Sequence, residues 1–273
     1  MASVEDDDGL RLVVRFARSG PAADSLAHHW RQIADLRADE RLGDWRRYLP
    51  VPASWRPDEH FGYLVESHPE GVTAADHVVA GADLDLMVER IGRAITPLHE
   101  RTTEQRPADA ADVASWIGEP IERLGQSGLR RRLGGLDSLG ARLEEAWLGR
   151  SVGVSRVMGD LALETVVVDA CGEVAAFIDW RQGRWGPSAV DPAHLALTAR
   201  ARQRRREVGA EMAELVSTPD PGMPDTDVLL LAWLWHVDGS LQQPQGGRAG
   251  DVWLVRNVEA VLAAVDGAQD GVS

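Results

Sequence analysis

The chain has 273 residues, of which 44% are apolar, and its formal net charge is −14 at pH 7. This length suits two unequal lobes that share a cleft, and the apolar content is enough for a sizeable core. The negative charge argues against nucleic acid and against an acidic membrane surface as partners, because both attract basic proteins. No apolar run approaches the ~18 residues of a membrane-spanning helix. The N-terminus is acidic where a secretory signal is basic and then apolar, so we expect a cytoplasmic protein.

The basic and thiol side chains limit the chemistry that is open to this chain. All 29 basic residues are arginine, so no step can use a lysine ammonium or a lysine Schiff base. The single cysteine, Cys171, cannot form an internal disulfide or, alone, a cysteine-based zinc site. We interpret it as an incidental small residue in a hairpin turn.

The N-terminal part of the chain predicts a small region of strands with one helix. Residues 10–17 are short and rich in branched side chains, which is typical of a strand. A helix is expected from Asp24 or Ser25, either of which could cap it, to Arg37. The segments that follow are expected to be a proline-marked loop over 48–57, a strand over 61–67 and a hinge over 69–71.

Beyond this hinge, apolar residues recur mainly at helical spacing. One exception is a pair of short branched segments joined by Asp169-Ala170-Cys171-Gly172, which predicts a β-hairpin. The tail, residues 266–273, is expected to fray. The predicted hairpin strands are 166–168 and 174–178, and the predicted helices are 84–99, 113–124, 136–148, 192–216, 227–240 and 252–265.

Two acidic residues flank the predicted hairpin. Asp160 follows Gly159 just before it, and Asp179 stands between Ile178 and Trp180 at its end. A hairpin can bring its two ends together, so both carboxylates are expected to face one cleft. Neighbouring carboxylates need a positive group between them, or one must take up a proton. Mg²⁺ with a phosphate chain supplies that charge, because Mg²⁺ favours one or two carboxylates plus phosphate oxygens.

The segment 157–197 resembles the catalytic hairpin of aminoglycoside phosphotransferases and related small-molecule kinases. The family pattern is His-Gly-Asp, four residues, Asn, then a strand, a turn, a strand and Ile-Asp-Trp. This chain has Met-Gly-Asp and Ile-Asp-Trp at the matching places. Further segments resemble the family's phosphate-binding strand, its hinge strand and the end of its first long C-lobe helix. They are Val13-Val14-Arg15, Tyr63-Leu64-Val65-Glu66 and Leu98-His99-Glu100-Arg101-Thr102.

The resemblance implies an α+β, two-lobe protein-kinase-like fold. It assigns residues 1–68 to a reduced N-terminal lobe of strands plus one helix, and residues 69–273 to a helical C-terminal lobe that carries the catalytic-type hairpin, 157–180. Matched residue by residue, Asp160 takes the place of the catalytic base and Asp179 that of the metal-binding acid. An active enzyme of this family would use ATP and Mg²⁺.

The chain departs from the family pattern at several positions. Met158 replaces the motif histidine, which mainly organises the loop. Thr165 stands where the family has a metal-binding Asn, and its hydroxyl is a shorter candidate ligand. Arg15 replaces the phosphate-binding lysine and is the candidate cofactor-binding residue, although arginine is not equivalent to lysine. Only nine residues precede the first predicted strand, too few for the family's Gly-rich hairpin, and Asp24 and Asp35 are weak candidates to pair with Arg15.

Several nearby residues have structural interpretations. Asp191 falls where the family often has an aspartate that braces the site. His28 and His29 are adjacent and cannot share a helix face, so we do not expect them to bind a metal as a pair. His194 and His236 are interpreted as partly buried helix histidines.

Other aromatic and basic residues allow two interpretations. Trp233 and Trp235 lie in an apolar helix and are expected in the core, whereas Trp180 and Trp185 could instead line a pocket near the predicted cleft. The basic run over 200–206 is either a solvated helix face or is paired internally. Its candidate partners are Glu207, Glu211 and Glu214.

Two functions from different classes remain open. In the first, the protein transfers the γ-phosphate of ATP to a hydroxyl of a small molecule or natural-product intermediate. Asp160 would deprotonate the hydroxyl, Asp179 would hold Mg²⁺, and Thr165 would be a secondary ligand. In the second, it is a catalytically silent pseudokinase that serves as a binding module or as the partner subunit of a biosynthetic enzyme. Losing the Gly-rich loop, the lysine and the asparagine together favours the second, because positioning and charge neutralisation supply nearly all of this catalysis.

Overall fold

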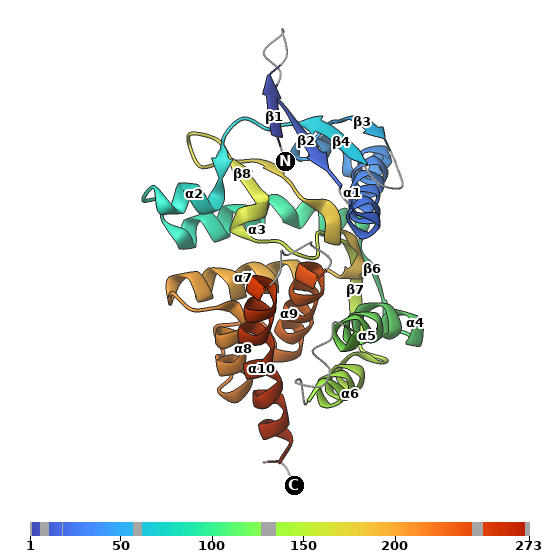
Figure 1. Ribbon diagram of the computed structural model, residues 1–273, viewed down its shortest axis with the longest axis vertical. Coiled ribbons are helices and arrows are strands. Elements are labelled where there is room, and N and C mark those ends of the chain that lie inside the picture. The colour runs from blue at the N-terminus through green and yellow to red at the C-terminus, as the bar shows by residue number, and fades with distance from the viewer. Residues whose placement is uncertain are drawn as a thin grey trace. The chain divides into compact units, whose positions relative to one another are not determined.

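The computed structural model describes residues 2–5, 11–17, 19–56, 62–126, 135–241 and 248–270, and its elements are labelled in Figure 1. The chain forms two compact units, each built from two stretches of sequence. Unit 1 comprises Met1–Thr102 and Leu161–Arg184, and unit 2 comprises Thr103–Asp160 and Trp185–Ser273. The compact units are divided at other places in the sequence, and the predicted lobe boundary between residues 68 and 69 stays a prediction.

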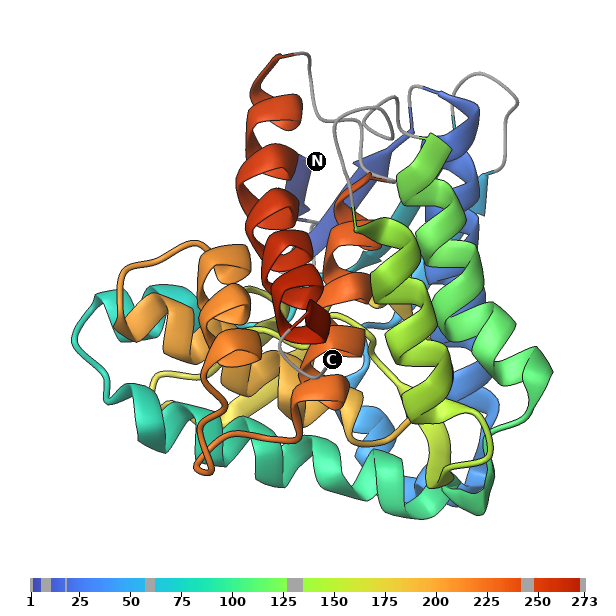
Figure 2. The same cartoon turned by 90° about the horizontal axis from the view of Figure 1, so that it is seen from below.

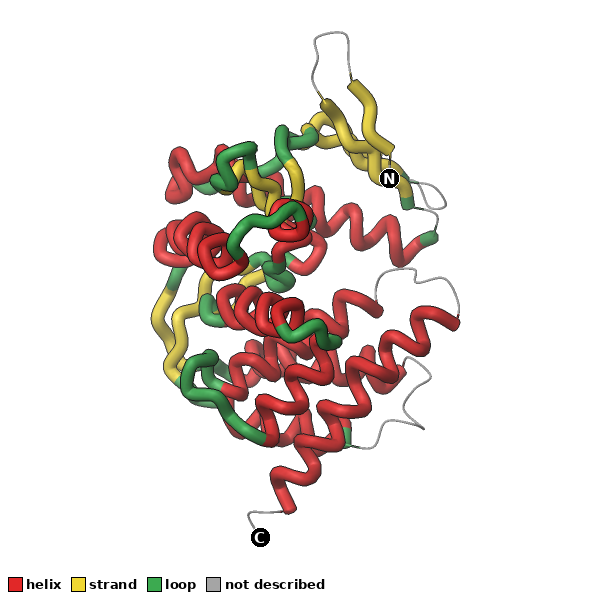
Figure 3. The backbone as a smooth tube through the Cα atoms, turned by 90° about the vertical axis from the view of Figure 1, so that its left-hand side faces the viewer, coloured by secondary structure: helices red, strands yellow, loops and turns green. Residues whose placement is uncertain are grey.

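Unit 1 contains a four-stranded antiparallel sheet with the strand order β1-β2-β4-β3. The predicted strands appear as β2 (Arg11–Phe16) and β4 (Tyr63–Ser67), whereas β1 (Ala2–Glu5) and β3 (Pro52–Arg56) were not expected. The prediction of a loop over 48–57 was therefore wrong in part. Its proline is compatible with β3 because Pro52 opens a strand at the edge of the sheet, where a missing N–H breaks no ladder. These strands are yellow near the N-terminus in Figure 3.

The first helix, α1 (Gly20–Ala38), begins earlier than predicted. Ser19 is its N-cap, and its hydroxyl accepts a hydrogen bond from the Ala22 N–H at 3.4 Å. A proline in the first turn needs no hydrogen-bond partner for its nitrogen, so this start is favourable. Ser19 thus takes the capping role that was assigned to Asp24 or Ser25.

The rest of unit 1 combines helices with the predicted hairpin. β8 and β9 pair antiparallel, and the short strand β5 lies on the other side of β8. Cys171 is exposed in the hairpin turn, which closes with a hydrogen bond from the Gly172 N–H to the Asp169 carbonyl. The elements are η1 (Glu40–Tyr48), β5 (Val72–Thr73), α2 (Ala74–Val79), α3 (Leu84–Thr102), η3 (Leu163–Thr165), β8 (Val166–Val168), β9 (Val174–Phe177) and η4 (Trp180–Gln182).

Unit 2 holds a second small sheet that the sequence pattern did not reveal. Its strand order is β10-β7-β6, with β6 (Glu104–Pro107), β7 (Ser151–Val157) and β10 (Arg184–Pro187). β6 exposes most of its side chains, so it lacks the alternation of apolar and polar residues by which a strand is recognised.

Helices make up the remainder of unit 2. The predicted helix over 192–216 is in fact two helices, because Arg205 adopts a positive φ of 54° between them. The last helix runs to Asp270, so fraying from residue 266 was wrong for 266–270. The elements are α4 (Ala110–Val113), η2 (Ala114–Gly118), α5 (Glu119–Gln126), α6 (Leu136–Trp147), α7 (Val190–Gln203), α8 (Val208–Ser217), α9 (Thr226–Leu241) and α10 (Arg248–Asp270).

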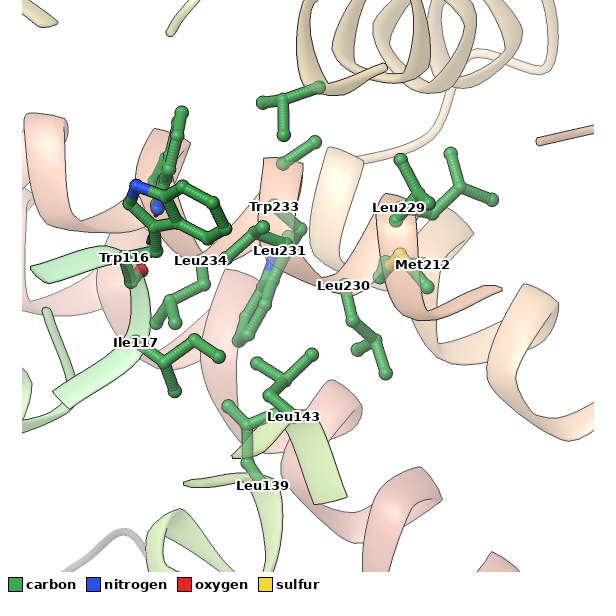
Figure 4. Packing of buried hydrophobic residues seen from close by; sticks show 14 of the residues in the cluster. Trp116, Ile117, Leu139, Leu143, Met212, Leu229, Leu230, Leu231, Trp233 and Leu234 are labelled. Carbon is green, nitrogen blue, oxygen red and sulfur yellow. Dashed lines mark hydrogen bonds between the residues drawn. The ribbon is translucent and has the colours of Figure 1, made fainter. Parts of the chain in front are cut away.

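The core of unit 2 is built around α9. Trp233 and Trp235 are fully buried, as predicted. Figure 4 shows Trp233 together with buried leucines of the same helix, among them Leu230, Leu231 and Leu234. α8 and α10 pack together closely (Figure 2), and a Cβ on Gly209 would lie 2.2 Å from the carbonyl oxygen of Asn257. Within the described part of the chain, no helix is long and apolar enough to cross a membrane.

Candidate active-site residues

The predicted catalytic base, Asp160, lies in a tight turn after β7. Gly159 has a φ of 78°, a left-handed value that glycine adopts without strain. Asp191, at the start of α7, is fully buried and holds this turn by accepting two backbone hydrogen bonds. One comes from the Met158 N–H and the other from the Gly159 N–H, both at 2.8 Å. The bracing predicted for Asp191 is present, and it fixes the loop although the motif histidine is lost.

Two histidines contact the Asp160 carboxylate. His236 of α9 places its Nδ1 2.9 Å from Oδ1 of Asp160, and His194 of α7 places its Nε2 3.4 Å from the same oxygen. The two imidazole rings lie 4.9 Å apart with 34° between their planes. His194 is fully buried and His236 about one-fifth exposed. The prediction of partly buried helix histidines gave their positions but missed this shared contact.

The predicted metal-binding acid, Asp179, follows β9 in an uncommon backbone conformation. Its φ and ψ are 70° and 65°, the left-handed region that non-glycine residues seldom enter outside functional turns. Arg181 holds both of its carboxylate oxygens, with Nε 2.5 Å from Oδ1 and a second contact from Nη2 to Oδ2. Burial raises the pKa of Asp179, but the Arg181 guanidinium outweighs this and holds the pKa below its usual value.

Thr165, the predicted secondary ligand, closes the turn that enters β8. Its hydroxyl accepts a hydrogen bond from the Ala162 N–H and donates one to the Ala162 carbonyl, both at 3.0 Å. The Thr165 carbonyl accepts the Ile178 N–H at 2.8 Å. Thr165 therefore lies opposite the residue that precedes Asp179, and the two candidate metal ligands belong to the same hairpin.

Arg15, the predicted phosphate-binding residue, is ion-paired inside unit 1. Its Nε lies 2.7 Å from Oε1 of Glu66, which is buried in β4. Oε2 of the same carboxylate is 2.8 Å from Nε2 of His29. Burial raises the pKa of Glu66, and the contacts with His29 and Arg15 more than offset this, so the pKa lies below its usual value. The partner of Arg15 is therefore a strand glutamate rather than either of the helix residues considered, Asp24 and Asp35.

His29 links this ion pair to the segment that follows Asp179. Its Nδ1 accepts a hydrogen bond from the Trp180 N–H at 3.0 Å, so a neutral ring must carry its proton on Nε2 and donate it to Glu66. Trp180 is fully buried and lies edge-on to Trp45, which places it in the core of unit 1 rather than on a pocket wall.

The sequence around Glu66 carries a signal for its buried position. Along β4 the buried positions alternate, and Glu66 shares the buried face with Leu64. A glutamate at a core position must be paired or hydrogen-bonded, because an isolated buried carboxylate is costly. Its partner could not be found by the same means, since Arg15 and His29 are distant in sequence.

The four predicted site residues divide between the two units. Asp179, Thr165 and Arg15 belong to unit 1, and Asp160 belongs to unit 2. The expectation that Asp160 and Asp179 face one cleft stays a prediction. Trp185 is 46% exposed, so it could contact a ligand. The Cζ atom of Arg156 lies over its ring, 5.2 Å from the ring centroid.

Comparison with known proteins shows the family of this chain. The model of the phosphotransferase enzyme family matches residues 2–250. The chain belongs to this family. No curated protein sequence matches it. The resemblance to aminoglycoside phosphotransferases is thereby confirmed.

Several solved phosphotransferases have similar structures. A thermostable mutant of aminoglycoside phosphotransferase APH(4)-Ia, in ternary complex with ADP and hygromycin B, aligns with a TM-score of 0.62 and 17% identity over 95% of this chain and 88% of that one. APH(3'')-Id from Streptomyces rimosus, in complex with ADP and streptomycin, aligns with a TM-score of 0.55 and 21% identity over 88% and 89%. These matches show the fold, and they confirm the predicted α+β protein-kinase-like class.

The hairpin that carries Thr165 and Asp179 offers a donor set suited to magnesium. Mg²⁺ takes oxygen ligands, and Asp179 and Thr165 supply a carboxylate and a hydroxyl from one hairpin. Bound there, the ion would neutralise charge on a phosphate chain. Arg181 already holds both Asp179 oxygens, so it would have to release at least one of them.

Proposed function

We propose that this phosphotransferase transfers a phosphate group from ATP to a hydroxyl of a small molecule, with Asp160 as the base. The observation that carries the proposal is the Asp160 turn, which Asp191 braces through two buried backbone hydrogen bonds. Such bracing fixes the backbone from which the Asp160 side chain projects. A base must lie within hydrogen-bond reach of the proton that it removes, so a fixed position is what catalysis needs.

The remaining residues have supporting roles in this proposal. Asp160 orients the substrate hydroxyl and accepts its proton as the oxygen bonds to the γ-phosphorus of ATP. The bond from that phosphorus to the oxygen bridging the β-phosphate breaks, and ADP leaves. Asp179, with Thr165, would hold the magnesium ion. Nε of Arg15 contacts Glu66. The other two guanidinium nitrogens of Arg15 would contact the phosphate oxygens.

The net charge favours a cationic substrate. The chain carries a formal charge of −14, and an acidic protein raises the local concentration of positively charged ligands. Two of the structural neighbours were solved with the aminoglycosides hygromycin B and streptomycin. We therefore include amino sugars in the substrate class, alongside other hydroxylated natural-product intermediates.

A transfer assay tests the proposed activity. Radiolabelled γ-phosphate of ATP would be followed onto hygromycin B, streptomycin and a panel of neutral polyols. Asp160→Asn should lower the rate by at least ~100-fold, as expected for loss of a general base. The matched control is Asp169→Asn, an exposed aspartate in the hairpin turn of unit 1, which should leave the rate unchanged. Transfer that survives Asp160→Asn would exclude this residue as the base.

A second candidate function is a catalytically silent binding module. Its supporting observation is Arg181, which occupies both oxygens of Asp179. A guanidinium there supplies the positive charge that a metal would otherwise provide, so the folded chain has no electrostatic need for Mg²⁺ at this point. In that case the chain would serve as a binding subunit of another enzyme.

Calorimetry with Mg-ATP separates the two candidates. A silent module should bind Mg-ATP weakly, and Arg181→Gln should strengthen binding by exposing Asp179. The matched control is Arg41→Gln, because Arg41 also holds both oxygens of an aspartate two residues away, Asp39. A dissociation constant near ~10 µM in the unaltered chain, about −7 kcal/mol, would favour the enzyme.

A further inference from the structure

We propose that Asp160, His194 and His236 form a binding site for a divalent transition metal of the zinc class. The three residues all belong to unit 2, and none of them is among the residues proposed to hold magnesium. The inference does not rest on that function, since it concerns metal binding by three side chains and requires no phosphate transfer.

The geometry of the three side chains fits such a metal. One ligand atom from each residue lies within 4.8 Å of the others. In a tetrahedral zinc site the metal–ligand distances of ~2.0–2.1 Å place neighbouring donors about 3.3 Å apart. The distances from Oδ1 of Asp160 to the two histidine nitrogens bracket this value, at 2.9 Å to His236 and 3.4 Å to His194. Two imidazoles and one carboxylate are also a donor set of catalytic zinc sites.

The three ligands are held by separate elements, so the site is preorganised. Asp160 is fixed by the turn that Asp191 braces. His194 is buried in α7, and His236 projects from α9, where the ring of Trp253 lies edge-on at 5.8 Å. Rigid ligands lose little conformational entropy when a metal binds, which strengthens binding.

The difference in burial leaves one side of the site accessible. His194 is fully buried, whereas His236 and Asp160 are 21% and 26% exposed. A metal held from the buried side would keep a position for water or a ligand on the exposed side, as in zinc sites with three protein ligands. Imidazole ligands favour zinc, cobalt, nickel and copper over magnesium, so this site and the Asp179 hairpin would select different ions.

Metal binding at this site would compete with the role of Asp160 as a base. The oxygen that contacts both histidines would then be a ligand and could not accept a proton from a substrate. If the proposed phosphate transfer occurs, zinc should inhibit it, and His236→Gln should relieve that inhibition. If no transfer is found, the binding experiment below still tests the metal site.

The experiment uses the full chain, freed of metal with a chelator that is then removed. Co²⁺ would be titrated while the visible absorption of the ion is recorded, and Zn²⁺ would be titrated by calorimetry in the presence of excess Mg²⁺. In His236→Gln and His194→Asn the new amide group does not occupy the position of the coordinating ring nitrogen. At most a weak amide ligand then remains. Each variant should weaken binding by at least ~100-fold. His77→Gln, at a half-buried histidine of α2, is the matched control and should not weaken it.

The outcomes divide clearly. A strong visible spectrum of tetrahedral or five-coordinate Co²⁺, lost in His236→Gln and kept in His77→Gln, supports the site. Circular dichroism checks that each variant is folded, and the partly exposed His236 keeps the test valid if a change at the buried His194 disturbs folding. Equal metal affinity in the unaltered chain and His236→Gln would overturn the proposal, since it would mean binding at scattered surface carboxylates. Absence of a Co²⁺ spectrum would do the same and leave only a hydrogen-bonded cluster.

Discussion

At the scale of single residues, the most informative feature is a carboxylate that holds a backbone turn. Asp191 accepts the N–H groups of Met158 and Gly159 and is completely buried. The sequence indicated its role only through a resemblance, because nothing in its local pattern shows which N–H groups it will meet. The contacts of His194 and His236 with Asp160 could not be predicted either, since three elements distant in sequence must pack before the side chains meet.

We predict that Asp191→Ala lowers the free energy of unfolding by about 2–4 kcal/mol, because two buried N–H groups lose their acceptor. Asp191→Asn keeps one acceptor oxygen and should cost less. The matched control is Asp169→Ala. Asp169 also accepts two backbone N–H groups, from Cys171 and Glu173, but it is exposed, so water can replace it. Urea denaturation measures all three, and an equal loss at Asp169 would show that burial is not the cause.

Asp179 and Arg181 give a prediction about pH. The pKa of Asp179 is lowered in the folded chain, so its ionised form stabilises the fold above the pKa of the unfolded chain. That contribution is lost as pH falls through the lowered pKa. In Arg181→Gln the carboxylate loses the partner that lowers its pKa most, so its pKa should rise, although Arg15 and His29 still lower it in part. The variant should therefore be least stable relative to the unaltered chain at neutral pH.

The deficit of Arg181→Gln should shrink as the pH is lowered below the usual range of aspartate, about 4, where the variant carboxyl is protonated first. Denaturant unfolding at a series of pH values from neutral to acidic measures it. Arg41→Gln is the control, because Arg41 is 53% exposed against 25% for Arg181, so solvent weakens its pair with Asp39 and the trend should be smaller. A deficit that stays constant with pH would show that Arg181 acts by packing alone.

At the scale of elements, the sequence located those whose apolar residues repeat regularly. The strands at β2 and β4, the β8–β9 hairpin and the helices α3 and α9 were all predicted. β6 was missed because it exposes most of its side chains, and β10 because it contains Gly186 and Pro187, residue types that are uncommon in strands. The break between α7 and α8 was missed because the arginines there favour a helix. In the folded chain these arginines form ion pairs with glutamates of α8, and these pairs hold the two helices together at the turn.

Ion pairs with Glu211 and Glu214 confirm internal pairing for Arg200, Arg204 and Arg206 of the basic run, and they carry the next prediction. Glu211 is fully buried and receives the Nε of Arg200 at 2.6 Å, whereas Glu214 is exposed and pairs with Arg204 at 2.7 Å. Glu211→Gln should therefore lower the free energy of unfolding by about 2 kcal/mol, as expected for a buried charged hydrogen bond. Glu214→Gln should change it little.

Denaturant unfolding of both variants, at low and high salt, provides the measurement. Salt should leave the Glu211 effect almost unchanged and erase whatever effect Glu214 has, because screening acts mainly on exposed charges. If both variants lose the same stability, the junction of α7 and α8 does not depend on the buried carboxylate.

At the scale of the whole molecule, composition limits how this phosphotransferase can bind charged ligands. The chain is strongly acidic and has no lysine, so arginine supplies the permanent positive charge for holding an anion, and it does so against an unfavourable field. The acidic balance was read from the sequence alone, and no tertiary detail was needed for it. Its consequence for ligands follows from Coulomb's law and is independent of the substrate's identity.

The final prediction is that salt acts in opposite directions on the two ligands of the proposed reaction. Mg-ATP is anionic and is repelled by a chain of charge −14, so raising the ionic strength should strengthen its binding. An aminoglycoside is polycationic and is attracted, so the same change should weaken its binding by about tenfold or more. Calorimetry of each ligand from ~10 mM to ~200 mM salt measures both slopes, with a neutral polyol as the control that should show no slope. An aminoglycoside whose affinity ignores salt would mean that net charge plays no part in its selection, and the substrate class would then have to be sought among uncharged hydroxyl compounds.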